Sequence, residues 1–231
     1  MIEWITLTSE TVGDVDRHLP VIIPLGLIEA HGPHLPLSVD VDTAAYFSRR
    51  VAENTGAILA PLLAYGFADE MREYPGTVGL SPATLSRVIV DISGMFCLHG
   101  FTRQIYLSGH GANKLAFDAA VQEIWKEYPA LRAAYWNYWT EAGITSIHHA
   151  DKGETEIAMA VGTRVKMEKA RDFTVEKPWY RIRSRRELNP DSGGINGQPS
   201  AAEPAEGERM REEIVRILSE KVRAIVAAEG G

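Results

Sequence analysis

The sequence has few of the features that mark secreted, membrane-spanning or nucleic-acid-binding proteins. Its 231 residues include one cysteine, Cys97, which cannot form an internal disulfide and lies in an apolar helical pattern typical of a buried side chain. No apolar stretch approaches the roughly 20 residues of a membrane span, and the start has neither a basic leader nor an apolar signal core. The net charge of −7 disfavours binding to nucleic acid or acidic membranes. We therefore expect a cytoplasmic protein without a nucleic-acid or membrane partner.

The chain also lacks the usual phosphate-binding signatures, internal repeats and domain linkers. Neither G-x-x-x-x-G-K-[ST] nor a G-x-G-x-x-G following the first predicted strand occurs. Apolar residues make up 45% and charged residues 24%, which are ordinary values for a globular protein, and the length suits one sizeable core. We therefore predict that residues 1–231 form a single domain.

The sequence alternates between strand and helix patterns. Short apolar runs predict strands over 21–27, 57–62, 103–109 and 131–139. Helical spacing predicts helices over 41–54, 82–99, 114–127, 154–161 and 206–229. The segments 64–81, 140–153 and 172–202 lack a steady period and are predicted to be loops or irregular extensions. This alternation indicates a parallel sheet with crossover helices.

Polar side chains follow the first of these strands at once. Glu29, His31, His34, Asp40 and Asp42 all come shortly after the apolar run 21–27, whose composition is typical of a strand buried on both faces. In open α/β sheets, ligands bind outside the carboxyl ends of the strands, where helices leave a crevice. Function should therefore be sought first at this strand end.

Later strand ends carry the same kinds of side chain. His110 follows the strand 103–109, and His149 and Glu154 follow the strand 131–139. Because crossover connections bring all carboxyl ends to one edge, we expect these groups to meet those of the first strand. Gly109 and Gly111 flank His110, which allows a tight turn and close approach of the backbone to a ligand.

Imidazole nitrogens and carboxylate oxygens together suit zinc, manganese or iron. An aspartate between two ions is a usual way to hold divalent cations about 3.5–4 Å apart. Glu29, His31, Asp40 and His110 are therefore interpreted as metal ligands, since two strands would otherwise end in acid and imidazole by coincidence. The set predicts a metal site at the sheet edge.

Several neighbouring residues have an ordinary structural explanation. A lone histidine near a strand end is more often hydrogen-bonded than a ligand, so His34, His99 and His148 are assigned to that class. Asp42 has an equally good explanation as the N-cap of the next helix, a role that Asp40 could share.

Two aromatic residues at the end of the strand 131–139 have two explanations of equal weight. Tyr138 and Trp139 could form a wall of a substrate pocket or pack in the core beneath it.

The motifs at these strand ends resemble those of the creatininase (creatinine amidohydrolase) family. The family pattern contains Glu-x-His-Gly-x-His-x-Pro, an aspartate shortly after, Gly-His-Gly-x-Asn, and His-Ala-Gly-x-x-Glu-Thr. Here residues 29–36 read EAHGPHLP, Asp40 follows, residues 109–113 read GHGAN, and residues 149–155 read HADKGET. Residues 75–77, PGT, are similar to the family's Phe-Pro-Gly-Thr loop. The resemblance covers residues 20–160.

The resemblance implies a three-layer αβα sandwich with a mainly parallel sheet, two divalent metal ions and hydrolysis of a C–N bond in an amide, cyclic amide or formamide. By position, Glu29 and His110 would bind the first metal and His31 the second, and Asp40 would bridge them. Glu154 would complete the second site or hold the reacting water. Family members are commonly oligomeric, often hexamers, so the resemblance also implies a homo-oligomer that acts on a small molecule.

The implied mechanism needs no protein nucleophile, because a metal-activated water attacks a carbonyl that a metal polarises. His149 would then protonate the leaving nitrogen, since histidine exchanges protons near neutral pH. The catalytic residues predicted in this way are His149 and Glu154.

The chain departs from creatininase at positions that affect the substrate. Creatininase has a glutamate ligand two residues after the histidine of its Gly-His motif, where this chain has Ala112. Glu156 replaces the usual serine after Glu-Thr. We therefore expect a family member other than creatininase itself. Peptide cleavage and ring opening of a cyclic diketone remain alternatives, as do a ligand-binding module and an inactive scaffold relative.

Overall fold

The computed structural model describes residues 1–68, 70–174 and 192–227, and its centre is a five-stranded parallel sheet. The strand order is β1-β3-β2-β4-β5. The strands are β1 (Ile2–Glu3), β2 (Val21–Leu25), β3 (Ile58–Leu59), β4 (Arg103–Ser108) and β5 (Arg132–Asn137).

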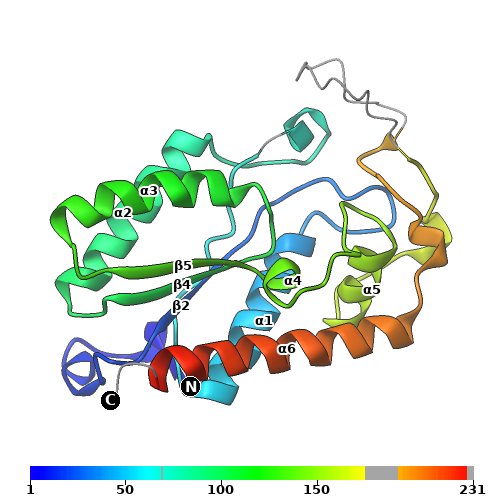
Figure 1. The fold of residues 1–231 in the computed structure, drawn as a ribbon. Helices are drawn as coiled ribbons and strands as arrows, with labels where there is room; N and C mark the ends of the chain where they lie inside the picture. The colour runs from blue at the N-terminus through cyan, green and yellow to red at the C-terminus, as the bar shows by residue number, and fades with distance from the viewer. Residues whose placement is uncertain (69, 175–191, 228–231) are drawn as a thin grey trace.

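Helices cover both faces of this sheet, with α2 and α3 on one side and α1 and α6 on the other (Figure 1). The helices are α1 (Val39–Thr55), α2 (Pro82–Leu98), α3 (Asn113–Glu127), α4 (Tyr138–Glu141), α5 (Lys152–Ala160) and α6 (Pro204–Ala227). Short 3-10 helices occur at Trp4–Thr6, Thr11–Asp14, Glu70–Glu73, Met167–Lys169 and Pro199–Ala201. The prediction of a three-layer αβα sandwich with a mainly parallel sheet is confirmed. Within the described ranges, no helix is long and apolar enough to cross a membrane.

The central strand β2 is apolar throughout because both of its faces are buried. Val21, Ile23 and Leu25 belong to the core cluster that α2 and α3 complete. Ile22 points the other way, into the cluster that contains residues of α1 and α6. Side chains alternate between the faces of a strand, so a strand with helices on both sides needs apolar residues at every position.

Local signals mark two of the predicted helix ends. Helix α1 ends at Thr55 and is followed by Gly56, which has a φ of 75° in the left-handed region that favours glycine. Helix α2 begins after Ser81, whose hydroxyl accepts a hydrogen bond from the Thr84 backbone N–H at 3.2 Å, and Pro82 takes the first helical position.

All four predicted strands are longer than those observed, two of them by three or more residues. The strand predicted over 57–62 is reduced to Ile58–Leu59, although Ala60 still donates a backbone hydrogen bond to Ile22. Pro61 has no N–H to donate, which interrupts the ladder. The strand predicted over 131–139 ends at Asn137, because the chain turns into the short helix α4.

The strand order creates a crevice between the carboxyl ends of β2 and β4. Helix α1 carries the chain from β2 to β3 on one side, and α3 carries it from β4 to β5 on the other. Ligands bind at such a switch point in doubly wound sheets, because the two connections diverge there.

Candidate metal centre

Four of the predicted ligands meet in the crevice between β2 and β4. Glu29 and His31 follow β2, Asp40 lies in the first turn of α1, and His110 follows β4. All four side chains are buried. Gly109 allows this approach, since a Cβ at that position would lie 2.1 Å from the Asp40 carbonyl oxygen.

The carboxylate of Asp40 lies between two imidazoles. Its Oδ1 is 3.3 Å from His31 Nε2, and its Oδ2 is 3.3 Å from His110 Nδ1. Each oxygen therefore faces a different ring, an arrangement that allows one carboxylate to bridge two cations.

Two more carboxylates complete the cluster. Glu29 Oε2 is 3.2 Å from His110 Nδ1, and Glu154 Oε2, from α5, is 3.5 Å from His31 Nε2. Two groups of potential ligands result, and they share Asp40: Glu29, Asp40 and His110 form one, and His31, Asp40 and Glu154 the other. Ala112 lines the same cavity without offering a ligand atom.

Backbone carbonyls orient the imidazoles. His31 Nδ1 is 3.0 Å from the Glu29 carbonyl oxygen and donates a hydrogen bond to it, so Nε2 faces Asp40 and Glu154. His149 Nε2 is 2.9 Å from the Ala30 carbonyl oxygen, and its Nδ1 faces Glu29 Oε2 at 3.6 Å. His149 also forms a third potential ligand group with Glu29 and His31.

Opposite charges offset the cost of burial in the cluster. Burial alone would lower the pKa of His31, but the carboxylates of Glu154 and Asp40 raise it well above its usual range. The pKa of His110 is likewise raised, since Glu29 and Asp40 outweigh desolvation. Burial would raise the pKa of Asp40, but the two imidazoles hold it well below its usual range. The pKa of Glu154 is likewise held below its usual range by His31, so Asp40 and Glu154 are ionised and available as ligands.

Buried polar atoms in the cluster fit a metal better than a purely protein network. Glu29 Oε1 has no hydrogen-bond partner among the described residues, and Glu29 Oε2, His31 Nε2 and Asp40 Oδ2 have only the other side chains of the cluster near them. Such atoms are costly to bury unless something satisfies them. Their chemistry, carboxylate oxygen and imidazole nitrogen, is that of zinc, manganese or iron ligands.

A cavity of about 220 Å³ opens onto the cluster. Its apolar wall includes Met71, Trp139 and Ile147, and His148 is on its exposed side. Trp139 lines this cavity and also packs against the core, whereas Tyr138 is fully buried in the core. Met71 was missed because the long loop that carries it has no periodic pattern.

Asn113 connects the turn formed by the GHGAN motif to the loop that carries Met71. Its Oδ1 accepts a hydrogen bond from Phe67 N at 2.7 Å, and its Nδ2 donates to the Gly26 carbonyl and the Ser108 hydroxyl at 3.2 Å each. Sequence reasoning gave Asn113 no role, although its place at the end of the GHGAN motif was a signal. The loop is also held at Thr77, which accepts a hydrogen bond from Ala30 N at 3.0 Å.

Two residues near the first strand end support the structure. His34 Nε2 lies 3.0 Å from the Thr155 hydroxyl, and burial lowers the pKa of His34 to about 4, so its ring is neutral at pH 7. The proposed N-cap role of Asp42 is wrong, because α1 begins after Ser38 and Asp42 lies in its first turn. Asp42 Oδ2 instead accepts hydrogen bonds from Ser38 and Thr163, both at 2.9 Å.

The irregular segment predicted over 172–202 lies partly outside the described residues. Its described end approaches the site, since Asn196 N donates a hydrogen bond to the His149 carbonyl at 3.2 Å.

Glu156, which stands where the family pattern has a serine, is buried. Its Oε1 accepts a hydrogen bond from the backbone N–H of Glu203, just before α6, at 2.9 Å.

Comparisons with known proteins find a family model, relatives in sequence and neighbours in fold. The family model described as "Creatininase: Creatinine amidohydrolase" matches residues 6–222. The mycofactocin precursor peptide peptidase of Mycolicibacterium smegmatis is 29% identical over 214 residues, covering 88% of this chain and 84% of that protein. The creatinine amidohydrolase of Pseudomonas putida is 30% identical over 131 residues, covering 51% and 50%. A solved structure described as "Creatininase Mn" has a TM-score of 0.87 at 22% identity, covering 96% of this chain and 98% of that one.

Proposed function

The chain belongs to the creatininase family of hydrolases, and from this premise we propose that it cleaves a C–N bond by a metal-activated water at a dinuclear site. The observation that carries the proposal is the position of Asp40, whose two oxygens each lie 3.3 Å from a different imidazole. The proposal treats residues 1–231 as one hydrolase domain in the cytoplasm.

The proposed ligands follow the two groups that share Asp40. Glu29 and His110 would hold the first divalent ion, and His31 and Glu154 the second, with Asp40 between them. Glu154 would supply the carboxylate that creatininase carries at the position of Ala112. Imidazole and carboxylate ligands suit zinc, manganese or iron. Manganese is also named in the description of the structural neighbour "Creatininase Mn".

The bound ions would supply a water of lowered pKa and polarise the substrate carbonyl. The protein's own part is to position the reacting groups and to move protons. The hydrogen bond to Ala30 fixes the ring of His149 with Nδ1 toward Glu29, at the cavity. From there His149 would donate a proton to the leaving nitrogen.

The proposed substrate is a small molecule with an amide, cyclic amide or formamide bond, since the cavity of about 220 Å³ is small. Peptide cleavage is the second candidate, because a relative that aligns over 88% of this chain is named as a peptidase. Ring opening of a cyclic diketone would use the same ligands. A non-catalytic binding module and an inactive relative are the non-enzyme alternatives.

Metal analysis combined with a substrate panel tests the proposal. Protein purified without chelators should contain about two divalent ions per chain, and dialysis against a chelator should abolish turnover. The panel contains formamides, lactams, short peptides and cyclic diketones, so its pattern assigns the bond that is cleaved. Protein without bound metal and without turnover, even after incubation with zinc, manganese or iron, would contradict the hydrolase.

We also propose a homo-oligomer, with a hexamer as one form. Large apolar side chains on the surface support it, since Ile5, Met95 and Leu98 are each more than half exposed. Light scattering coupled to size-exclusion chromatography tests this part separately from activity.

A further inference from the structure

A hydrogen bond joins two segments that are far apart in the sequence and that both adjoin the candidate metal centre. The hydroxyl oxygens of Tyr74 and Ser192 are 2.7 Å apart. Tyr74 belongs to the loop 64–81, and Ser192 begins a stretch that we call the return segment, residues 192–197. Ser192 is buried, and its hydroxyl also accepts a hydrogen bond from Gly194 N at 3.1 Å. The bond therefore fixes the start of the return segment to the loop.

The return segment packs against the backbone around His149. Asn196 N donates a hydrogen bond to the His149 carbonyl at 3.2 Å. Gly194 has a φ of 88°, and a Cβ at this position would lie 3.0 Å from the Ala30 carbonyl oxygen. The same carbonyl accepts the hydrogen bond from His149 Nε2 at 2.9 Å. The return segment therefore contacts both the backbone of His149 and the group that orients its ring.

The loop 64–81 also holds the Ala30 peptide directly. The N–H of Ala30 donates a hydrogen bond to the Thr77 hydroxyl at 3.0 Å, and its C=O accepts the one from His149. The loop thus supports His149 by two routes. Thr77 binds the Ala30 peptide, and Tyr74 binds the segment that packs over the carbonyl of that peptide.

The backbone next to His149 has an unfavourable conformation. Ala150 has a φ of 49°, and among the described residues it is the one non-glycine residue with a positive φ. This left-handed conformation is unfavourable for alanine, because Cβ comes close to the following carbonyl oxygen. Such residues persist only where the surrounding contacts hold them, and they cluster at active sites. The contact of Asn196 with the preceding carbonyl is one that holds this turn.

We propose that Tyr74 is a positioning residue for His149. Its hydroxyl holds the return segment at Ser192, and the segment keeps the His149 ring with Nδ1 toward the cavity. Displacement of a reacting group by about 1 Å can cost about 100-fold in rate, so a remote hydroxyl can affect turnover. Tyr74 does not line the cavity and acts through His149. The inference rests on the proposed role of His149 as proton donor.

NMR of the full chain, free of metal and with labelled histidine rings, tests the positioning itself. The ring centroids of His149 and His31 are 4.4 Å apart, so the ring current of His31 shifts the His149 signal while the ring is held. The signal is identified by its loss in His149→Gln. Tyr74→Phe should broaden it or move it toward the position of an exposed histidine. Tyr65→Phe is the matched control, since Tyr65 is 54% exposed on the same loop, and it should leave the signal in place.

Kinetics of the metal-loaded enzyme test the route through His149. Tyr74→Phe should retain metal and lower kcat about 10-fold, which is less than the loss expected when the ring itself is removed. Ser192→Ala removes the other partner of the bond, and the double variant should lose no more than Ser192→Ala alone. In a His149→Gln chain, Tyr74→Phe should cause no further loss of kcat. Circular dichroism checks that each variant is folded.

Each outcome decides between the two proposals. An unchanged His149 signal in Tyr74→Phe overturns the inference, and so does an equal loss of kcat with and without the His149 ring. Either result leaves the hydrolase intact. A wild-type chain that hydrolyses no member of the substrate panel overturns the hydrolase, and the NMR signal of the metal-free protein then still shows whether Tyr74 positions His149.

Discussion

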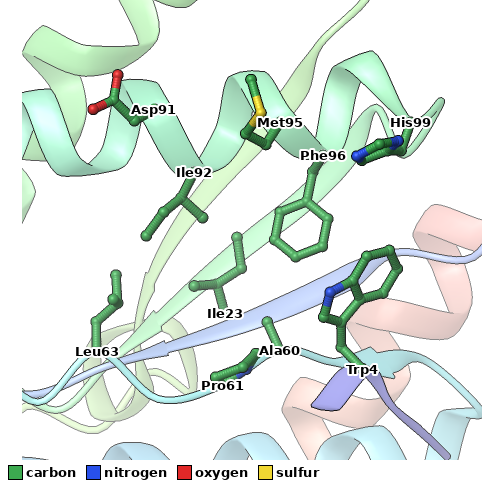
Figure 2. Close-up of a pocket in the computed structure, with 10 residues that line it drawn as sticks. All are labelled: Trp4, Ile23, Ala60, Pro61, Leu63, Asp91, Ile92, Met95, Phe96 and His99. Atoms are coloured by element: carbon green, nitrogen blue, oxygen red, sulfur yellow. The ribbon is translucent and has the colours of Figure 1, made fainter. Parts of the chain in front are cut away.

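Two cavities of this molecule differ in size and in chemistry, and the smaller one is lined by the candidate site residues. The cavity of about 220 Å³ at the strand ends contains Glu29, Asp40, His110, His149 and Glu154. The cavity of about 430 Å³ beside α2 has a mostly apolar wall, with Asp91 and His99 at its rim (Figure 2). Convergent titratable groups, rather than volume, therefore indicate where chemistry takes place.

The difference follows from how the chain builds each cavity. The candidate metal centre lies at the switch point of the sheet, where residues after β2 and β4 meet residues of α1 and α5. The larger cavity lies over a sheet face, where strand side chains are apolar because they belong to the core. Polar groups can converge at strand ends, whereas a sheet face can only offer an apolar contact.

The sharpest test of this comparison removes one acid from each cavity. Asp40→Asn should reduce metal content below two ions per chain and reduce turnover to background, since an amide is a poor bridging ligand. Asp91→Asn should leave both unchanged, because Asp91 lies at the rim of the other cavity. Metal analysis and turnover of the two variants provide the measurement. Unaltered metal and activity in Asp40→Asn would remove the bridging role.

The next test compares histidines. His149→Gln should retain metal and lose turnover by about 10²–10⁴-fold, the range for general acid–base groups. His99→Gln, in the apolar cavity, should keep full turnover. The rates are compared at saturating substrate and with the metal content measured. Loss of metal in His149→Gln would instead assign His149 as a ligand, consistent with its group with Glu29 and His31.

The convergence of most of the candidate ligands was predictable from sequence, because each of them closely follows a recognisable strand. A buried parallel strand is recognisable as an apolar run, and its carboxyl end follows directly, which led to Glu29, His31 and His110. Asp40 was recognisable as part of the same stretch. The meeting of these residues required only that the strands be parallel.

Other parts depend on contacts between distant segments and could not be predicted in this way. The strand β1 has two residues, too few for a pattern, and is defined by its pairing with β3. Met71 reaches the cavity from a loop that Asn113 and Thr77 hold. The cavity beside α2 exists because no further helix of the described chain covers that face of the sheet. A local sequence pattern cannot show that such a helix is missing.

A smaller effect should come from a substitution at Gly109, which packs closely against the candidate metal centre. Gly109→Ala adds a Cβ 2.1 Å from the Asp40 carbonyl oxygen, a backbone atom that cannot rotate away. Overpacking of this kind should cost about 1–3 kcal/mol in the free energy of unfolding and weaken metal binding by moving Asp40. Denaturant unfolding of the metal-free protein and metal titration measure the two effects. Unchanged metal affinity would mean that Gly109 does not determine the position of Asp40.

The smallest predicted effect is at a glycine on the apolar side of the molecule. Gly94 lies within α2, and a Cβ there would meet Tyr128 Cε2 at 3.5 Å, an ordinary contact. Alanine costs less backbone entropy than glycine in a helix, so Gly94→Ala should stabilise the protein by about 0.5–1 kcal/mol. Thermal unfolding should then shift upward by about 1–4 °C, with metal content and turnover unchanged. A destabilised variant would mean that the space around Gly94 is as tightly packed as that around Gly109. The expected difference in packing between α2 and the strand ends would then be wrong.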